Sequence, residues 1–302
     1  MKFFYLAHSV MSLECLKGLA AENFKPGLIV IHKSLDRNKL IKEFYTPVKE
    51  FCSENKIDLY ESDNVNDLRE KLFDFDTGVC VGFMSILKKE IFSLPENGIL
   101  NLHCGKLPEY RGRAPISRSI MNGEEVLTVT VHRIDEGVDS GDICKEYQIK
   151  IGREDDVNSL YRECSRVSSV IISECLRDIS ERKLIYTKQL SDKPAYKVIS
   201  NEERKIKWSD KAEAIFNKIR ALTFPYPCAF FSFKNKKYLI IKSDLSDKNV
   251  TSDAEAGTVT KVSDSEMEIL TGKGKIIILK ITDEDLNEIK FTEHFKTGDL
   301  LK

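Results

Sequence analysis

The chain has 302 residues, enough for one large or two medium domains with a proper hydrophobic core. Its 47 Lys and Arg residues against 48 Asp and Glu residues leave a formal net charge of −1. A protein that grips nucleic-acid phosphate is more often clearly basic, so this balance argues mildly against a tRNA-sized partner.

The eight cysteines are scattered along the chain and form neither a CxxC pair nor a zinc-type spacing. Several lie in apolar runs, which predicts buried, reduced thiols in a cytoplasmic protein. No run approaches the roughly 18 apolar residues of a membrane span, and the apolar start lacks a signal-peptide cleavage pattern. We expect no metal site, although four side chains could in principle meet as ligands: His103, Cys104, His132 and Cys144.

The N-terminal part of the chain alternates short apolar strands with helices. Strands are predicted over residues 2–7, 27–32, 57–60 and 78–83, the last being central. Ser9 or Ser12 can cap the first helix. This β-α-β opening predicts a parallel sheet. It contains neither a G-x-G-x-x-G fingerprint nor a P-loop, so neither a dinucleotide site nor an ATP site is indicated.

Residues 98–142 carry the strongest chemical pattern. A short strand, Ile99–Leu102, leads into His103, and because side chains alternate along a strand, Asn101 and His103 share one face. A second strand at 126–131 ends in a loop of acidic residues and glycines. An amide donor, an imidazole and a loop carboxylate, if they converge, are the groups needed for acyl transfer.

The C-terminal part has a different pattern. A strand at 143–151 and a helix from Asp155 or Asp156 to about Arg182 precede a stretch of mixed polarity, Leu184–Lys205, which we interpret as a linker. Ser209 is the expected cap of the next helix. Short strands then recur and favour a small β-barrel; they are expected at 238–241, 257–262, 266–270 and 275–279.

Five ordered matches within residues 98–142 resemble the active-site signature of the 10-formyltetrahydrofolate-dependent formyltransferases. They are Asn101-Leu102-His103, Leu107-Pro108, Tyr110-Arg111-Gly112, Ala114-Pro115 and Asp139-Ser140-Gly141. The resemblance implies that Asn101, His103 and Asp139 form a catalytic triad. Cys104 departs from the pattern, because many members have Gly there, and we expect its bulk to influence which acceptor fits.

The resemblance also implies 10-formyltetrahydrofolate as the formyl donor and no metal. Ser85, Ile86 and Leu87 would give backbone contacts to the pterin, unless this stretch is a plain strand-to-helix turn. Arg113 would lie near the cofactor, unless it is a surface ion pair. A second loop would close over the pterin, formed by Asp135, Glu136, Gly137 and Val138.

The implied fold is α/β: a Rossmann-like formyltransferase domain with a mostly parallel sheet at residues 1–190, a linker at 191–205, and an OB-like β-barrel domain at 206–302. In the second domain the resemblance rests on Ile206–Ser209, Arg220-Ala221 and Pro225–Pro227. It suggests a homodimer joined through the barrel domain.

Two branches of the family have this length, and they differ in acceptor. One formylates nucleotide-linked amino sugars; the other is methionyl-tRNA formyltransferase, with a basic barrel and a basic insertion. Residues 201–302 are close to charge-balanced, and the Leu35–Lys42 loop is short with few arginines. We therefore predict the sugar nucleotide, with initiator Met-tRNA as the alternative. Residues 36–39 are interpreted as a solvated loop, or else as the border of the acceptor site.

A non-catalytic binding module is the hypothesis from another class. An OB-type groove for single strands combines basic residues with exposed aromatics. Lys234, Lys236, Lys237 and Tyr238 offer such a patch, although a hairpin turn with solvated lysines explains them more simply.

Overall fold

The computed structural model describes residues 1–33, 41–83, 85–191, 193–246 and 254–301. Residues 36–39, expected to be a solvated loop, and Met84 lie outside them. The chain divides into two compact units. The first comprises Met1–Pro115, Val126–Lys150 and Leu160–Tyr196; the second comprises Ile116–Glu125, Ile151–Ser159 and Lys197–Lys302. The second unit thus takes two segments from within the range 1–190.

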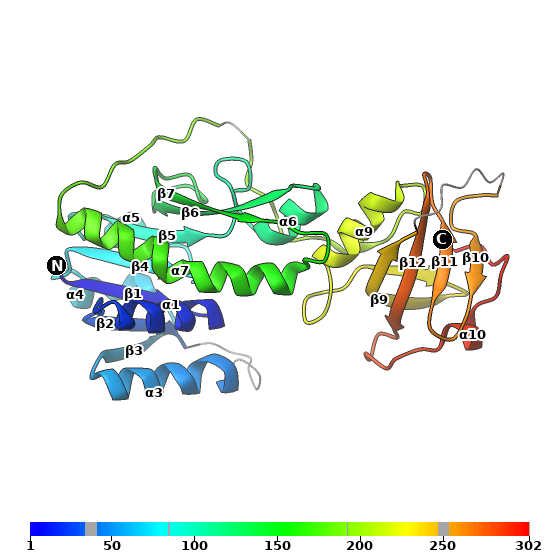
Figure 1. The fold of residues 1–302 in the computed structure, drawn as a ribbon. Coiled ribbons are helices and arrows are strands. Elements are labelled where there is room, and N and C mark those ends of the chain that lie inside the picture. The colour runs from blue at the N-terminus through cyan, green and yellow to red at the C-terminus, as the bar shows by residue number, and fades with distance from the viewer. Residues whose placement is uncertain (34–40, 84, 192, 247–253, 302) are drawn as a thin grey trace. The chain divides into compact units, whose positions relative to one another are not determined.

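The first unit is built on a seven-stranded sheet in the order β3-β2-β1-β4-β5-β6-β7 (Figure 1). The strands are β1 Phe3–Ala7, β2 Leu28–His32, β3 Asp58–Ser62, β4 Thr77–Val81, β5 Ile99–His103, β6 Val126–Arg133 and β7 Ile143–Lys150. The pairs from β3 to β5 are parallel, whereas β5–β6 and β6–β7 are antiparallel. The mostly parallel sheet, with β4 at its centre, is confirmed.

Helices follow the early strands as the alternation predicted. Their bounds are α1 Val10–Ala21, α3 Thr46–Asn55, α4 Arg69–Leu72, α5 Lys89–Phe92, α6 Pro115–Met121 and α7 Val157–Ser180, with a π-turn at Ile41–Tyr45 and a 3₁₀ turn at Val65–Asp67. Ser9 and Ser12 cap α1 reciprocally. A Cβ at Gly18 would lie 2.2 Å from Ser169 Oγ, so the glycine lets α1 and α7 approach closely. Helix α6 was not predicted.

The core of the first unit lies where the apolar strands meet the short helices. Every residue of β1 and β4 is buried, as expected for inner strands of a parallel sheet. One cluster joins β1 and β4 to the turns that follow β3 and β4, and it includes Phe4, Cys80, Leu87 and Ile91. This packing anchors the strand ends that carry the polar residues described below.

The second unit is built on a five-stranded antiparallel sheet in the order β10-β11-β12-β9-β8. Its elements are α8 Asn201–Arg204, α9 Ala212–Ala221, β8 Phe230–Phe233, β9 Lys236–Leu245, β10 Val259–Val262, β11 Met267–Leu270, β12 Lys275–Thr282 and α10 Phe291–His294. Short strands after an α/β domain are therefore confirmed.

Ser209 does not cap α9, so that prediction was wrong. The helix begins after Lys211 and has no side-chain cap. The residues before it are held by the β11–β12 turn instead, because Ala212 N donates to Lys273 O and Gly272 N donates to Asp210 O. These backbone bonds delay the start of the helix.

The lysine patch of the second unit is a hairpin turn, and its aromatic member is not exposed. Lys234 lies over the ring of Phe233, and Lys237 pairs with Glu284 at 3.0 Å. Tyr238 is buried, stacks on Phe231 and bonds His294 through its hydroxyl. The simpler interpretation, a hairpin turn, is therefore confirmed, and the alternative of an exposed stacking surface was wrong, because strand alternation turns Tyr238 into the core. No helix in the described part of the chain is long and apolar enough to span a membrane.

Candidate active site

The three polar residues singled out from the sequence meet at one end of β5. Asn101 and His103 project from β5, and Asp139 lies in the loop after β6, the neighbouring antiparallel strand. His103 Nδ1 lies 3.6 Å from Asp139 Oδ2, and Asn101 Nδ2 lies 3.4 Å from Asp139 Oδ1. The structure thus brings the amide, the imidazole and the carboxylate together.

His132 belongs to the same cluster, although sequence analysis considered it only as a metal ligand. Its Nε2 lies 3.0 Å from Asn101 Nδ2 and 3.4 Å from Asp139 Oδ1, while Nδ1 lies 3.0 Å from the carbonyl of Arg133. A carbonyl only accepts, so Nδ1 carries a proton and donates it to Arg133 O.

A sequence signal for His132 did exist. Thr128, Thr130 and His132 are alternate residues of β6, and all three are buried. Three polar side chains on the buried face of a strand are unusual and need hydrogen-bond partners. The register that pairs Asn101 with His132 then decides which partner this one meets.

A hydrogen bond holds the Asp139 carboxylate, and the backbone around it has an unusual conformation. Gly112 N donates to its Oδ2 at 2.9 Å. The residue has a φ of +49°, a left-handed conformation that costs a non-glycine residue roughly 1 kcal/mol. Two residues on, a Cβ at Gly141 would lie 1.8 Å from Arg133 O, so only glycine permits this close return of the loop.

Protonation of the cluster follows from its burial and its contacts. Burial raises the pKa of Asp139, but the hydrogen bond with His132, the charges of the two histidines and the Gly112 N–H outweigh it and lower the pKa to about 2. Burial holds the pKa of His103 below its usual 6.5, despite the nearby carboxylate. At neutral pH, Asp139 is therefore ionised and His103 neutral. The His103 proton sits on Nε2, 2.7 Å from the carbonyl of Tyr110.

Residues 85–87, which were expected to contact the pterin, lie in a turn whose backbone is fixed by hydrogen bonds. Asn66 holds it from the 3₁₀ turn, because its amide donates to Ile86 O at 3.1 Å and its carbonyl accepts from Lys88 N at 2.7 Å. The Ile86 side chain is 81% exposed, Ser85 is half-buried, and the Leu87 side chain packs in the core cluster. Asn66 was not predicted to be a site residue.

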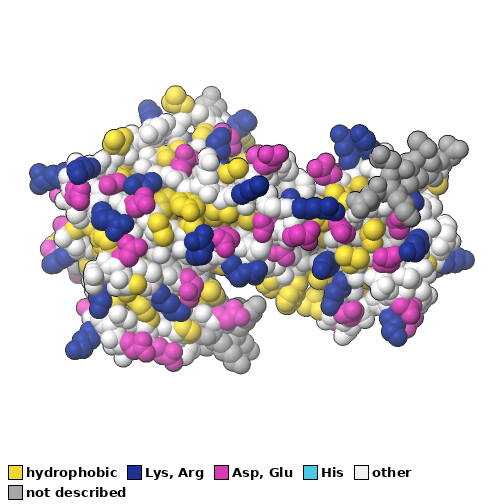
Figure 2. All heavy atoms as spheres, viewed as in Figure 1, with side chains coloured by type: hydrophobic (Ala, Val, Ile, Leu, Met, Phe, Trp, Pro, Cys, Tyr) yellow, Lys and Arg dark blue, Asp and Glu magenta, His cyan; other side chains and the backbone are white. Residues whose placement is uncertain are grey.

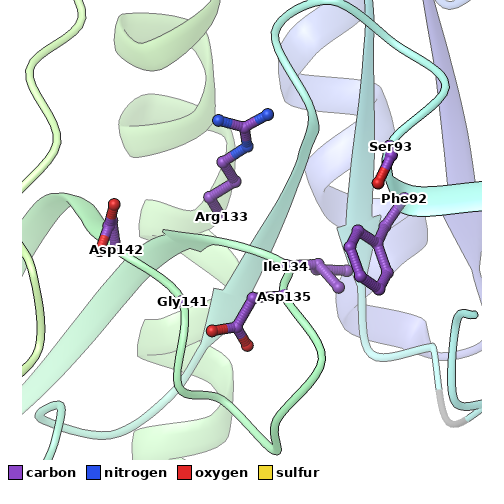
Figure 3. A pocket seen from close by; sticks show the side chains of 7 residues that line it. All are labelled: Phe92, Ser93, Arg133, Ile134, Asp135, Gly141 and Asp142. Atoms are coloured by element: carbon purple, nitrogen blue, oxygen red, sulfur yellow. The ribbon is translucent and has the colours of Figure 1, made fainter. Parts of the chain in front are cut away.

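The side chain of Asp135, the first residue of the loop at 135–138, forms hydrogen bonds that stabilise the loop. Asp135 Oδ1 accepts from Gly137 N at 3.1 Å and from Ser140 Oγ at 2.6 Å. Glu136 forms an exposed ion pair with Lys89, and the Val138 side chain is 55% exposed. Asp135 also borders a cavity of about 250 Å³; Figure 3 shows its lining from α5, the end of β6 and the loop: Phe92, Ser93, Arg133, Ile134, Asp135, Gly141 and Asp142.

The other predicted site residues do not line this cavity. Arg113 is exposed, and its backbone N–H donates to Tyr196 O at 2.9 Å. The Cys104 thiol contacts Met11 Sδ at 3.7 Å. Within the described ranges, no group of three or more His, Cys, Asp or Glu side chains is arranged to hold a metal ion.

Residues 184–191 and 193–196, part of the stretch 184–205 interpreted as a linker, belong to the first unit and are hydrogen-bonded to it at separate points. Thr187 exchanges backbone hydrogen bonds with Ile143, and Tyr196 does so with Arg111 and Arg113 on either side of Gly112. Between these contacts the Gln189 side chain is buried. Sequence analysis missed Gln189, because an isolated glutamine in a polar stretch carries no local signal.

Comparison with known proteins agrees with this geometry. The profile of the family described as "Formyl transferase" matches residues 19–176, and that of "Formyl transferase, C-terminal domain" matches residues 198–298. The methionyl-tRNA formyltransferase of Pelagibacter ubique (strain HTCC1062) is 31% identical over 284 residues, which cover 91% of this chain and 88% of the relative.

Two solved structures share the fold. The N-formyltransferase from Helicobacter canadensis, in complex with folinic acid and dTDP-3-aminofucose, has a TM-score of 0.69 and is 22% identical, covering 92% of this chain and 99% of its own. WlaRD, a sugar 3N-formyl transferase in the presence of dTDP and 5-N-formyl-THF, has a TM-score of 0.69 and is 21% identical, covering 92% and 97%. Because the two family profiles and the Pelagibacter ubique relative match most of the chain, the chain belongs to the formyl transferase family of enzymes.

Proposed function

We propose that this enzyme moves a formyl group from 10-formyltetrahydrofolate to the amine of a nucleotide-linked amino sugar. The observation that carries the chemistry is the convergence of Asn101, His103 and Asp139. For the donor, both solved structures named above hold a folate derivative. For the acceptor, the support is the dTDP-3-aminofucose bound to the Helicobacter canadensis protein and the near-neutral charge of this chain.

The proposed reaction assigns one role to each side chain of the triad. The acceptor amine forms a bond to the formyl carbon, the carbonyl oxygen becomes negative, and the bond to N10 of the folate then breaks. Asn101 Nδ2 would exchange its longer contact, 3.4 Å to Asp139, for the oxyanion. Loss of one such donor typically raises a barrier by about 2.7–4 kcal/mol.

His103 would carry the proton. In its neutral form the ring holds a lone pair at Nδ1, which can take the proton that the attacking amine loses. The ionised Asp139 would stabilise the resulting imidazolium. His103 would then give the proton to N10 as the tetrahydrofolate leaves, so that the ring returns to its starting state.

We propose that the folate pterin lies against the two loops already described. Ser85, Ile86 and Leu87 would present backbone groups to the pterin. This suits the turn, because Asn66 already fixes its backbone through hydrogen bonds with the Ile86 carbonyl and the Lys88 N–H. The loop from Asp135 to Val138 would cover the ring, and Arg113 would lie near the rest of the cofactor. The 250 Å³ cavity beside Asp135 falls slightly below the usual range of about 300–1,000 Å³ for ligand pockets, so it would take part of such a molecule.

Initiator Met-tRNA is the second candidate acceptor. The observation that favours it is the 31% identity to the Pelagibacter ubique methionyl-tRNA formyltransferase over most of both chains. Against it, the face shown in Figure 2 carries basic and acidic side chains interspersed over both units. A surface that binds tRNA phosphates concentrates positive charge.

The acceptor is tested by measuring tetrahydrofolate release from 10-formyltetrahydrofolate. A panel of nucleotide-linked amino sugars is compared with methionine-charged and uncharged initiator tRNA, each with and without enzyme. We expect turnover that depends on an amino sugar. Turnover with the charged tRNA alone would move the enzyme to the second function, and formation of no formylated product with either class would overturn both.

The protonation of the site predicts the pH dependence. Protonating His103 removes the lone pair at Nδ1, so kcat/KM is expected to fall with decreasing pH, and burial, which lowers the pKa of His103, places this fall below the usual imidazole value of about 6.5. The Asp139 carboxylate raises the pKa of His103, so Asp139→Asn should move this fall to lower pH in the residual activity. The measurement is kcat/KM against pH for both proteins; an unmoved profile would contradict the assigned coupling.

A further inference from the structure

The side-chain amide of Gln189 forms hydrogen bonds through both its nitrogen and its oxygen, with the Asp139 loop and with Arg111. Its Nε2 donates to the carbonyl of Asp139 at 3.0 Å and to that of Gly141 at 2.6 Å. Its Oε1 accepts from Arg111 Nε at 2.9 Å. The side chain is 9% exposed, and the amide nitrogen has both of its hydrogens engaged.

These contacts bear on the direction of the catalytic carboxylate. Asp139 has a left-handed backbone, which persists only when its surroundings enforce it. The two carbonyls bound by Gln189 are that of Asp139 itself and that of Gly141, on either side of Ser140. At the other end of the amide, Arg111 precedes Gly112, whose N–H binds Asp139 Oδ2. The buried Gln189 amide therefore connects the backbone of the Asp139 loop to the Arg111–Gly112 segment, whose Gly112 N–H binds the Asp139 carboxylate.

We propose that Gln189 is a positioning residue that sets the Asp139 carboxylate against His103 and Asn101. It touches neither substrate nor reacting atoms; it acts through the backbone of the Asp139 loop. The inference rests on the proposed role of Asp139 but not on the identity of the acceptor. Gln189 reaches the loop because the chain around it is hydrogen-bonded to the first unit at Thr187 and Tyr196.

Two substitutions separate the contacts. Gln189→Met keeps the length of the side chain and removes every hydrogen bond. Gln189→Glu keeps an acceptor for Arg111 but removes both donors to the loop carbonyls. Each variant is expected to lower kcat about 10- to 100-fold, with KM for donor and acceptor within about 2-fold, because a displaced reacting group costs turnover more than binding. Gln148→Met, at an exposed position of β7, is the matched control and should leave kcat unchanged.

The decisive measurement is a double-mutant cycle. If Gln189 acts through the Asp139 carboxylate, Gln189→Met should cost little further kcat in the Asp139→Asn background, where that carboxylate is absent. An equal loss in both backgrounds would show a merely structural role and overturn the proposal. So would a Gln189→Met or Gln189→Glu enzyme with wild-type kcat. If Asp139→Asn alone kept near-normal kcat, the proposed triad would fail instead, which separates the two hypotheses.

Discussion

Replacing His103 with Gln, or Asp139 with Asn, is expected to lower kcat by about 10²- to 10⁴-fold, the usual contribution of a positioned proton-transfer group. Both substitutions nearly preserve side-chain volume. Gln at 103 can still donate to the Tyr110 carbonyl, and Asn at 139 can still accept from Gly112 N. The loss should therefore arise from chemistry, with the fold intact.

Steady-state kinetics with saturating 10-formyltetrahydrofolate and acceptor measure this effect, and circular dichroism and thermal unfolding report the fold. His294→Gln, in the second unit, is the matched histidine control and should retain kcat. Because the triad works as a unit, the double variant should lose little more than the worse single variant. A kcat within about 3-fold of wild type for either single variant would show that the triad assignment is wrong.

Substituting Gly141 with Ala should have the second largest effect. The added Cβ would lie 1.8 Å from Arg133 O and 2.8 Å from the carbonyl carbon, both backbone atoms that cannot rotate away. The loop must shift, and the shift passes to Asp139, two residues earlier. A displacement of about 1 Å at a catalytic group can cost on the order of 10²-fold in rate. We expect that loss in kcat together with a lower Tm.

Gly272→Ala is the control for the structural part of this effect. A Cβ there would lie 1.9 Å from Ser209 O, a clash of similar severity in the second unit. It should lower Tm to a comparable degree and leave kcat per folded molecule unchanged. Normal turnover by Gly141→Ala would mean that the loop conformation does not set the catalytic geometry.

Much of the first unit could be predicted from the sequence because its signals are local. Apolar runs of strand length, separated by capped helices, predict a parallel sheet, and Ser9 and Ser12 form the expected cap. The placement of Asn101 and His103 on one face follows from the two-residue period of a strand. Asp139 was identified through the resemblance of an ordered set of residues, since a lone loop carboxylate carries no such information.

Only the tertiary structure decided which groups surround the triad. His132 meets Asn101 because an antiparallel register brings together residues 31 positions apart. Gln189 lies 50 positions from Asp139 and reaches it because backbone hydrogen bonds at Thr187 and Tyr196 tie the surrounding chain to the first unit.

The sequence by itself determined the strands of the first unit, most of its helices and the chemical type of the site, because strand and helix periodicity are properties of neighbouring residues. The partners of Asn101, Asp139 and the buried Tyr238 were decided by packing, because a hydrogen bond forms with whichever group the fold brings within about 3 Å, however distant along the chain.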